Sequence, residues 1–112
     1  MTDSDAVRRV GLALPRAYEV EVRGRAKFRV KQIVFVAFSQ DEREMGFGFP
    51  KEEREALVAS RPDTFQMPGQ SDLRYHWVVA RMDALDRDEL EELVHDAWRM
   101  VVPKFLARDH LG

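Results

Sequence analysis

Residues 21–38 read EVRGRAKFRVKQIVFVAF, and two patterns within this stretch specify the fold. From Glu21 to Lys31, charged residues alternate with small or apolar ones, which is typical of a β-strand with one face on the core. The segment 32–38 is almost entirely apolar and rich in β-branched and aromatic residues, which indicates a central strand covered on both faces. We therefore expect two neighbouring antiparallel strands here.

A two-residue turn at Lys31-Gln32 gives the best register between these strands. It sets three apolar pairs side by side on the core face: Val30 with Ile33, Phe28 with Phe35, and Ala26 with Ala37. A turn at Gly24-Arg25 would set Val22 against Lys27 and lose the pattern. Because a slip of one residue turns every side chain over, we favour the turn at Lys31-Gln32.

The rest of the chain adds helices and strands around this pair. The sequence predicts helices over 3–14, 51–60 and from Asp86 to about Val102, and strands over 45–49, 74–82 and, briefly, 64–67. The expected order is α-β-β-β-α-β(-β)-α, in an α+β fold with two layers: an antiparallel sheet and helices packed on one of its faces. At 112 residues we expect a single domain over 1–112, with about 103–112 as a possible flexible tail.

The last long helix has the clearest local signals. Asp86 is a good N-cap residue and Glu89 follows three positions later, which is the spacing of a capping box. Leu85 and Leu90 occupy the two positions of a hydrophobic staple around this cap. Trp98 lies on the apolar stripe of the same helix, so we expect it in the core.

Charge is unevenly distributed along the chain, although the net charge is only −2. Residues 1–31 hold eight Lys/Arg against four Asp/Glu, a charge of +4, whereas 32–112 hold ten against sixteen, a charge of −6. The whole molecule therefore has no global attraction to nucleic acid or to an anionic membrane. A basic region near the beginning remains the main functional lead.

Composition and motifs argue against several functions. The chain has no cysteine, which excludes disulfides, thiolate metal sites and cysteine nucleophiles. His95 and Asp96 are adjacent on a helix and diverge, and no spacing typical of a zinc site occurs. We therefore predict no catalytic residue, no metal, no cofactor and no enzyme activity. Nor does any apolar run reach membrane-spanning length, and the first fifteen residues do not resemble a signal peptide, so we expect a cytoplasmic protein with no membrane role.

Four segments together resemble the MmcQ/YjbR family. They are LP at 14–15, FRVKQIVFVAF at 28–38, YHWVVARM at 75–82 and ELVHDAWRMV at 92–101, and their order and spacing match over about residues 7–102. The resemblance implies a compact two-layer fold related in shape to type III secretion chaperones. It also implies the DNA-binding role proposed for the family, in which two β-hairpin wings reach toward the duplex. Residues 45–49, MGFGF, depart from the family because members often carry a lysine in that strand.

The candidate nucleic-acid site is the basic stripe of the alternating stretch, with one later cation: Arg23, Arg25, Lys27, Arg29, Lys31 and Arg74. On a projecting hairpin, these side chains would meet backbone phosphates without reading sequence. Two simpler interpretations compete, and we weight them above DNA binding. Edge strands carry Lys and Arg to prevent sheet-to-sheet aggregation, and the same cations can pair with acids of the last helix.

Two further features bear on binding. Tyr75 and Trp77 share one face of the predicted strand 74–82; we interpret them as core, with an exposed stacking platform as the alternative. His76 is a single imidazole, which we interpret as structural. Val34, Val36 and Phe38 need cover from a helix or from another chain. The sequence thus leaves open a protein partner or a second copy of the chain in place of DNA.

Overall fold

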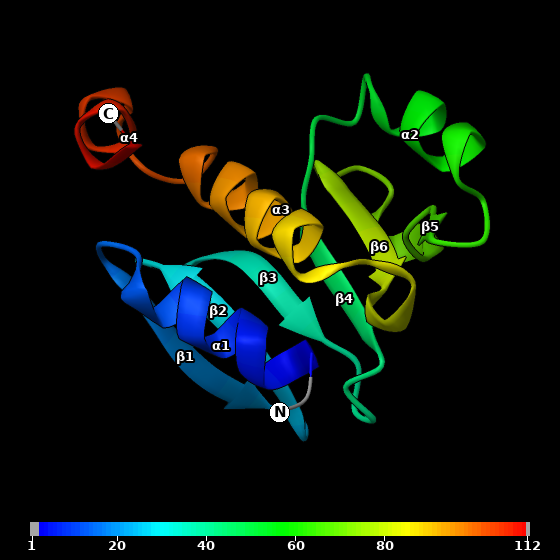
Figure 1. The fold of residues 1–112 in the computed structure, drawn as a ribbon, viewed down its shortest axis with the longest axis horizontal. Helices are drawn as coiled ribbons and strands as arrows, with labels where there is room; N and C mark the ends of the chain where they lie inside the picture. Colours follow the sequence, from blue (N-terminus) through cyan, green and yellow to red (C-terminus); the bar gives the residue numbers. More distant parts are fainter. Residues whose placement is uncertain (1–2, 112) are drawn as a thin grey trace.

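The computed structural model describes residues 3–111, which form one six-stranded sheet with four α-helices (Figure 1). The helices are α1 (Asp3–Ala13), α2 (Arg54–Ser60), α3 (Arg87–Arg99) and α4 (Lys104–Leu111). The strands are β1 (Ala17–Val22), β2 (Arg25–Val30), β3 (Ile33–Phe38), β4 (Glu44–Gly48), β5 (Phe65–Gln66) and β6 (Trp77–Arg81). Two short 3-10 helices, η1 (Gln70–Asp72) and η2 (Met82–Ala84), flank β6.

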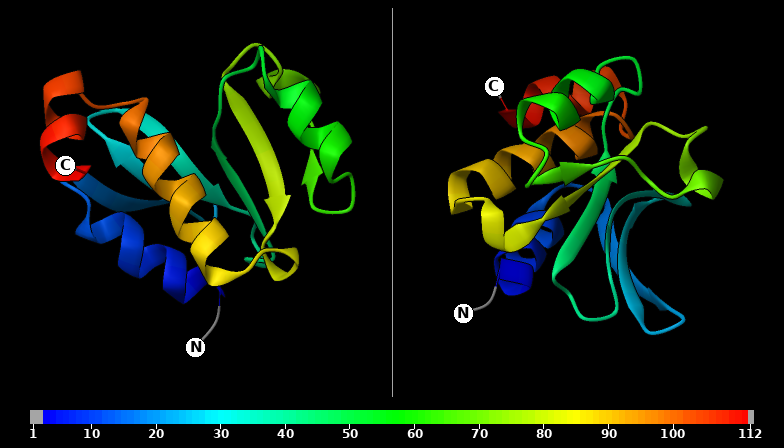
Figure 2. Two further views of the ribbon diagram at one scale, coloured as in Figure 1. Left: turned by 45° about the horizontal axis from the view of Figure 1, so that its top comes forward. Right: turned by 90° about the vertical axis from the view of Figure 1, so that its right-hand side faces the viewer.

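The sheet is antiparallel throughout, in the order β1-β2-β3-β4-β6-β5. Helices α1 and α3 lie against one face of it, and their apolar sides form the core together with that face (Figures 1 and 2). The predicted α+β fold with two layers is confirmed. We call the opposite face of β2, β3, β4 and β6, which carries neither α1 nor α3, the open face.

The alternating stretch is two strands, so one more strand precedes α2 than the sequence predicts. The chain turns at Arg23-Gly24, where both residues have positive φ, 54° and 77°. Such φ values at both central positions of a two-residue hairpin are the type I′ pattern, which matches the twist of the flanking strands. Val22 therefore pairs with Arg25 on one face and Glu21 with Ala26 on the other, so the charged residues of β1 and those of β2 lie on opposite faces of the sheet.

The turn at Lys31-Gln32 is also present, with Val30 opposite Ile33, but the predicted register beyond it is wrong. A β-bulge places Phe28 opposite Val36 and Arg29 opposite Val34, which leaves Phe35 as the extra residue. Phe28 therefore does not pair with Phe35, nor Ala26 with Ala37, whose partner is Lys27. The bulge lets both Phe35 and Val36 enter the core, where each is fully buried, and this burial stabilises the irregular register.

Helix α3 closes the core as its local signals predict. The capping box between Asp86 and Glu89 is present in both directions, and Leu85 and Leu90 are buried. Trp98 is fully buried, and its indole Nε1 donates a hydrogen bond of 2.9 Å to the carbonyl of Pro15. This bond ties the end of α3 to the connection between α1 and β1.

Other boundaries differ from those predicted. The strand expected over 74–82 begins at Trp77, because residues 73–76 form a loop, and Tyr75 is 50% exposed instead of core. The helix expected over 51–60 begins at Arg54, and residues 104–111, the possible tail, form α4. Val36 and Phe38 are fully buried within the chain itself, while Val34 is half-buried.

Candidate nucleic-acid interface

Strand β2 presents a row of three cations on the open face. Ala26, Phe28 and Val30 are buried in the core, and strand alternation therefore directs Arg25, Lys27 and Arg29 to the other side. Same-face side chains recur roughly every 6.6 Å along a strand. Within residues 3–111, none of these three has a carboxylate oxygen within ion-pairing distance.

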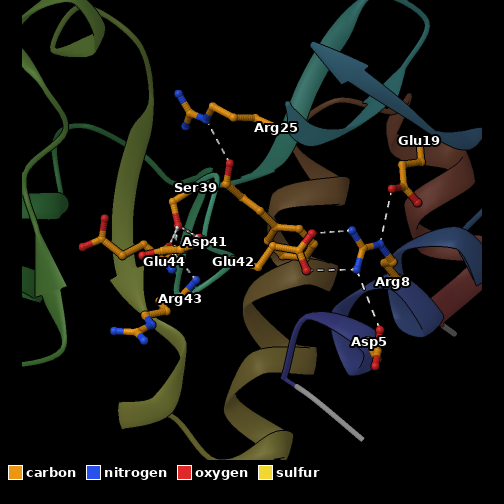
Figure 3. Close-up of polar contacts among 10 residues, drawn as sticks. Asp5, Arg8, Glu19, Arg25, Ser39, Asp41, Glu42, Arg43 and Glu44 are labelled. Carbon is orange, nitrogen blue, oxygen red and sulfur yellow. Dashed lines mark hydrogen bonds and ion pairs between the residues drawn. The ribbon is translucent and has the colours of Figure 1, made fainter. Parts of the chain in front are cut away.

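Each of the three cations has its own surroundings. The Arg25 Nε donates a hydrogen bond of 3.0 Å to the carbonyl of Phe38, which holds the side chain across β3 (Figure 3). Lys27 and Arg29 are half-buried. The Nε of Arg29 is buried and has no hydrogen-bond partner among the described residues, so this polar group is desolvated without compensation from the protein.

Arg23 and Lys31 lie at the two ends of this row, in the turns that begin and end β2. Both adopt left-handed backbone conformations and both are exposed. Each turn is held by a side chain: Gln40 donates to the carbonyl of Arg23 at 3.1 Å, and the Tyr18 hydroxyl donates to the carbonyl of Lys31. The five cations of the stretch thus stay on one hairpin region, three in a row and one at each end.

Arg74 lies in a different part of the fold, in the loop before β6. Its guanidinium is 4.8 Å from the centre of the Tyr75 ring, and its Nη2 donates to the Tyr75 hydroxyl at 2.9 Å. Arg74 therefore does not extend the β2 row. It stacks on an aromatic residue that faces the same pocket as Arg25 and Lys27.

That pocket, of about 630 Å³, is hollowed into the open face. Arg25 and Lys27 line one side of it, and Tyr75 and His76 of the loop, with Trp77 at the start of β6, line the other. The lining also includes two small residues of the central strands, Ala37 and Gly48, and four larger apolar ones: Ile33, Val34, Met100 and Val101. The pocket thus brings together residues that are far apart in the sequence, from β2 and β3 to the end of α3.

Each of the two glycines of MGFGF leaves room for a neighbouring group. A Cβ on Gly46 would lie 2.6 Å from atoms of the Trp77 indole, so the indole occupies the space that a side chain would need. A Cβ on Gly48 would lie 3.7 Å from the Ala97 backbone of α3, which is an ordinary contact distance. Trp77 is consequently half-buried on the open face, not inside the core.

Tyr75 and Trp77 form an aromatic wall on one side of the pocket. A buried arginine that the sequence did not indicate holds this wall in place. Arg54, at the start of α2, is only 7% exposed, and its guanidinium donates to three carbonyls of the loop, those of Leu73, Tyr75 and Trp77, at 2.6, 2.9 and 3.4 Å. His76 adds a further tie, since its Nδ1 accepts from the backbone N–H of Lys51 at 3.0 Å. Hydrogen bonds from Arg54 and from the backbone of Lys51 thus hold this loop in place.

Acidic side chains that could have neutralised the β2 row pair elsewhere. On α3, Glu89 binds Arg61, whose guanidinium lowers the pKa of this carboxyl, and Asp96 binds Arg99. The prediction that β2 cations pair with acids of the last helix is therefore wrong. The other interpretation, that these cations prevent sheet-to-sheet aggregation, requires them to lie on an edge strand. Strand β2 lies between β1 and β3, and β1 is the edge strand on this side of the sheet.

Residues 3–111 offer neither a metal site nor a membrane span. No group of three or more His, Asp or Glu side chains is arranged to hold a metal ion. No helix in this range has both the length and the apolar character needed to cross a bilayer.

Comparison with known proteins shows where this fold belongs. The structure is similar to the crystal structure of Deinococcus radiodurans protein DR2400, whose domain is described as DUF419, with a TM-score of 0.77 and 21% sequence identity over 88% of this chain and 77% of the other. A search of curated protein sequences found no match. The family model named YjbR matches residues 12–100, most of the chain. The protein therefore belongs to the YjbR family, as the four sequence segments indicated.

Proposed function

We propose that this protein binds DNA through the open face of its sheet, with Arg25, Lys27 and Arg29 on backbone phosphates and Arg23 and Lys31 at the two ends of the row. The role is binding, with no catalytic step assigned to any residue. Binding to chromosomal DNA would place the chain in the cytoplasm, as its composition predicts.

One observation carries this proposal. Three cations stand in a row on a central strand, on a face that α1 and α3 leave uncovered, and no carboxylate in residues 3–111 pairs with them. Elsewhere the chain pairs its arginines readily; Arg8 alone contacts three acids, Asp5, Glu19 and Glu42. An unneutralised row in an acidic protein is the charge pattern that an anionic partner complements.

The expected mode is weak and independent of sequence. In residues 3–111, α1 and α3 pack on the other face of the sheet from these cations, so we expect the contacts to be to phosphate, which positions a protein on DNA without reading bases. Each phosphate neutralised releases condensed counterions. With three to five cations engaged, the logarithm of the binding constant should fall with the logarithm of salt concentration with a slope of roughly −2.7 to −4.5.

Fluorescence anisotropy with a generic labelled duplex tests the proposal. We expect binding at about 50 mM salt that weakens along this slope toward about 200 mM. The double variant Lys27→Glu with Arg29→Glu should abolish it. The matched control is Lys104→Glu with Arg108→Glu, which makes the same change of charge on the exposed surface of α4. Equal loss in both variants, or no binding by the wild type at low salt, would rule out a DNA role for this face.

A second candidate is a protein partner or a second copy of the chain on the same face. Apolar residues around the pocket are unusually exposed, with Ile33 54% and Met100 43% exposed. Multi-angle light scattering over a range of concentrations tests self-association. A dimer that Ile33→Lys converts to a monomer would support it, and a monomer at every concentration would exclude it.

A further inference from the structure

We propose that the pocket on the open face takes one unpaired nucleotide of a DNA strand, with its base against Tyr75 and Trp77 and its phosphate toward Arg25 and Lys27. The identity of the partner as DNA rests on the proposed function. The added claim is that the protein prefers a single strand with accessible bases to a closed duplex. That claim comes from the aromatic wall, which phosphate binding alone does not require.

The register places the cations and the aromatic wall on the two sides of one shallow trough. Lys27 pairs with Ala37, Ala37 with Gly46, and the Trp77 indole lies over Gly46. Neighbouring strands are about 4.8 Å apart, so Lys27 and the position under the indole are separated by roughly 10 Å of small-residue floor. A flat ligand can lie on this floor and reach both sides.

The aromatic wall is accessible and also held in place. Tyr75 is 50% exposed and has the Arg74 guanidinium 4.8 Å from its ring centre, while Trp77 is half-buried over Gly46. Behind them, Arg54 holds the carbonyls of both residues, and its third bond holds Leu73. Stacking on such fixed rings accepts any base, because every base has a π face.

The charges around the pocket determine the orientation of a bound nucleotide. Arg25 uses its Nε on the Phe38 carbonyl, and its two Nη groups have no hydrogen bond within the described residues. Lys27 beside it has no ion pair there. On the opposite side the pocket is lined by Asp72, which repels an anion. A phosphate therefore belongs on the β2 side and an uncharged ring on the loop side.

A nucleotide within a strand fits these constraints better than a duplex or an acidic peptide does. The volume of about 630 Å³ is in the usual range for a pocket that encloses one small ligand. A nucleotide carries a planar ring and a phosphate one sugar apart, which matches the two sides of the trough. Bases in a duplex are stacked on each other and unavailable for Tyr75, so only an unpaired one can enter.

The test compares oligo(dT) with a duplex of the same length by anisotropy and by tryptophan emission. Trp98 is fully buried, so quenching on binding reports Trp77, and Trp77→Phe should remove it. We expect Tyr75→Leu to weaken oligo(dT) binding by about tenfold, within the range that loss of one stacked base produces, and to leave duplex binding unchanged. The control is Phe105→Leu, an exposed aromatic residue on α4 outside the pocket lining.

The outcomes separate this inference from the proposed function. Salt-dependent duplex binding without a preference for oligo(dT), or equal losses for both ligands in Tyr75→Leu, would overturn the nucleotide pocket and leave DNA binding intact. Absence of binding to either ligand would overturn both. Equal quenching of Trp77 by thymidine monophosphate alone would assign the pocket to a free nucleotide, and equal quenching by a poly(Glu-Tyr) peptide would assign it to an acidic protein; either result would overturn the inference.

Discussion

Arg8 on α1 and Glu42 in the loop between β3 and β4 form a two-point ion pair, with Nη2–Oε2 at 2.7 Å and Nη1–Oε1 at 3.2 Å (Figure 3). The same guanidinium reaches Glu19 on β1 at 3.3 Å and lies 5.2 Å from the centre of the Phe38 ring. One side chain thus joins the first helix, the edge strand and a loop. The hydrogen bond with Glu42 raises the pKa of Arg8, and the reciprocal bond lowers the pKa of the Glu42 carboxyl.

Glu42→Gln should lower the free energy of unfolding at pH 7 by about 1 kcal/mol, a modest value because the pair is partly exposed and screened. The Glu42 pKa is lowered on folding, so its contribution is complete above the unfolded value near 4.5 and is lost as pH falls below it. Urea denaturation at several pH values measures this. The wild type and the variant should converge in acid, while Glu91→Gln, on the exposed side of α3, should show no difference at any pH.

Arg54→Met should destabilise the protein by about 2 kcal/mol, because three carbonyls lose their charged donor in a buried place. Arg54→Lys should recover only part of this loss, since an ammonium lacks the planar fork that reaches several acceptors. Thermal or urea unfolding gives the comparison, and hydrogen exchange should show faster opening of residues 73–77. Arg108→Met on the exposed side of α4 is the control; if it costs as much as Arg54→Met, the buried contacts contribute nothing.

Gly46→Ala and Gly69→Ala make the same chemical change in opposite surroundings. The new methyl at 46 would lie 2.6 Å from the Trp77 indole, whereas nothing lies within 4 Å of a methyl at 69. We expect the first to cost about 1–3 kcal/mol and to shift Trp77 emission as the ring moves. The second should be neutral or slightly stabilising, because alanine restricts the unfolded chain. Similar stabilities for the two variants would mean that the indole does not pack on Gly46.

Much of the fold is predictable because its signals are local. The capping box of Asp86 and Glu89, the apolar stripe ending at Trp98 and the turn at Lys31-Gln32 each depend on residues within a few positions of one another. The assignment of cations to one face of β2 also follows from alternation alone. These features were predicted correctly for that reason.

The parts that the sequence did not predict depend on contacts between distant segments. The bulge at Phe35 is decided by how two consecutive residues enter a shared core, which no period-2 pattern shows. Arg54 looks like an ordinary cation of a surface helix until the 73–77 loop folds over it. The pocket needs β2, β4 and that loop together, and its one signal in the sequence was the pair of glycines at 46 and 48.

Substitutions in the turn at Arg23-Gly24 test the stability of the hairpin and the role of its charge separately. Arg23 has φ of 54°, and the left-handed region costs a non-glycine residue roughly 1–2 kcal/mol, less for asparagine. Arg23→Asn creates the Asn-Gly pair that type I′ turns favour, so we expect a gain of about 0.5 kcal/mol in urea denaturation. Gly24→Ala, at φ of 77°, should do the opposite and cost about 1 kcal/mol.

The same substitution removes one cation from the proposed DNA-binding row. If Arg23 contacts a phosphate, Arg23→Asn should weaken duplex binding and make the salt slope shallower by about 1 while the protein becomes more stable. A more stable hairpin that binds DNA with an unchanged slope would remove Arg23 from the interface. It would leave Arg25, Lys27 and Arg29, which lie on the strand itself, as the residues on which phosphate binding depends.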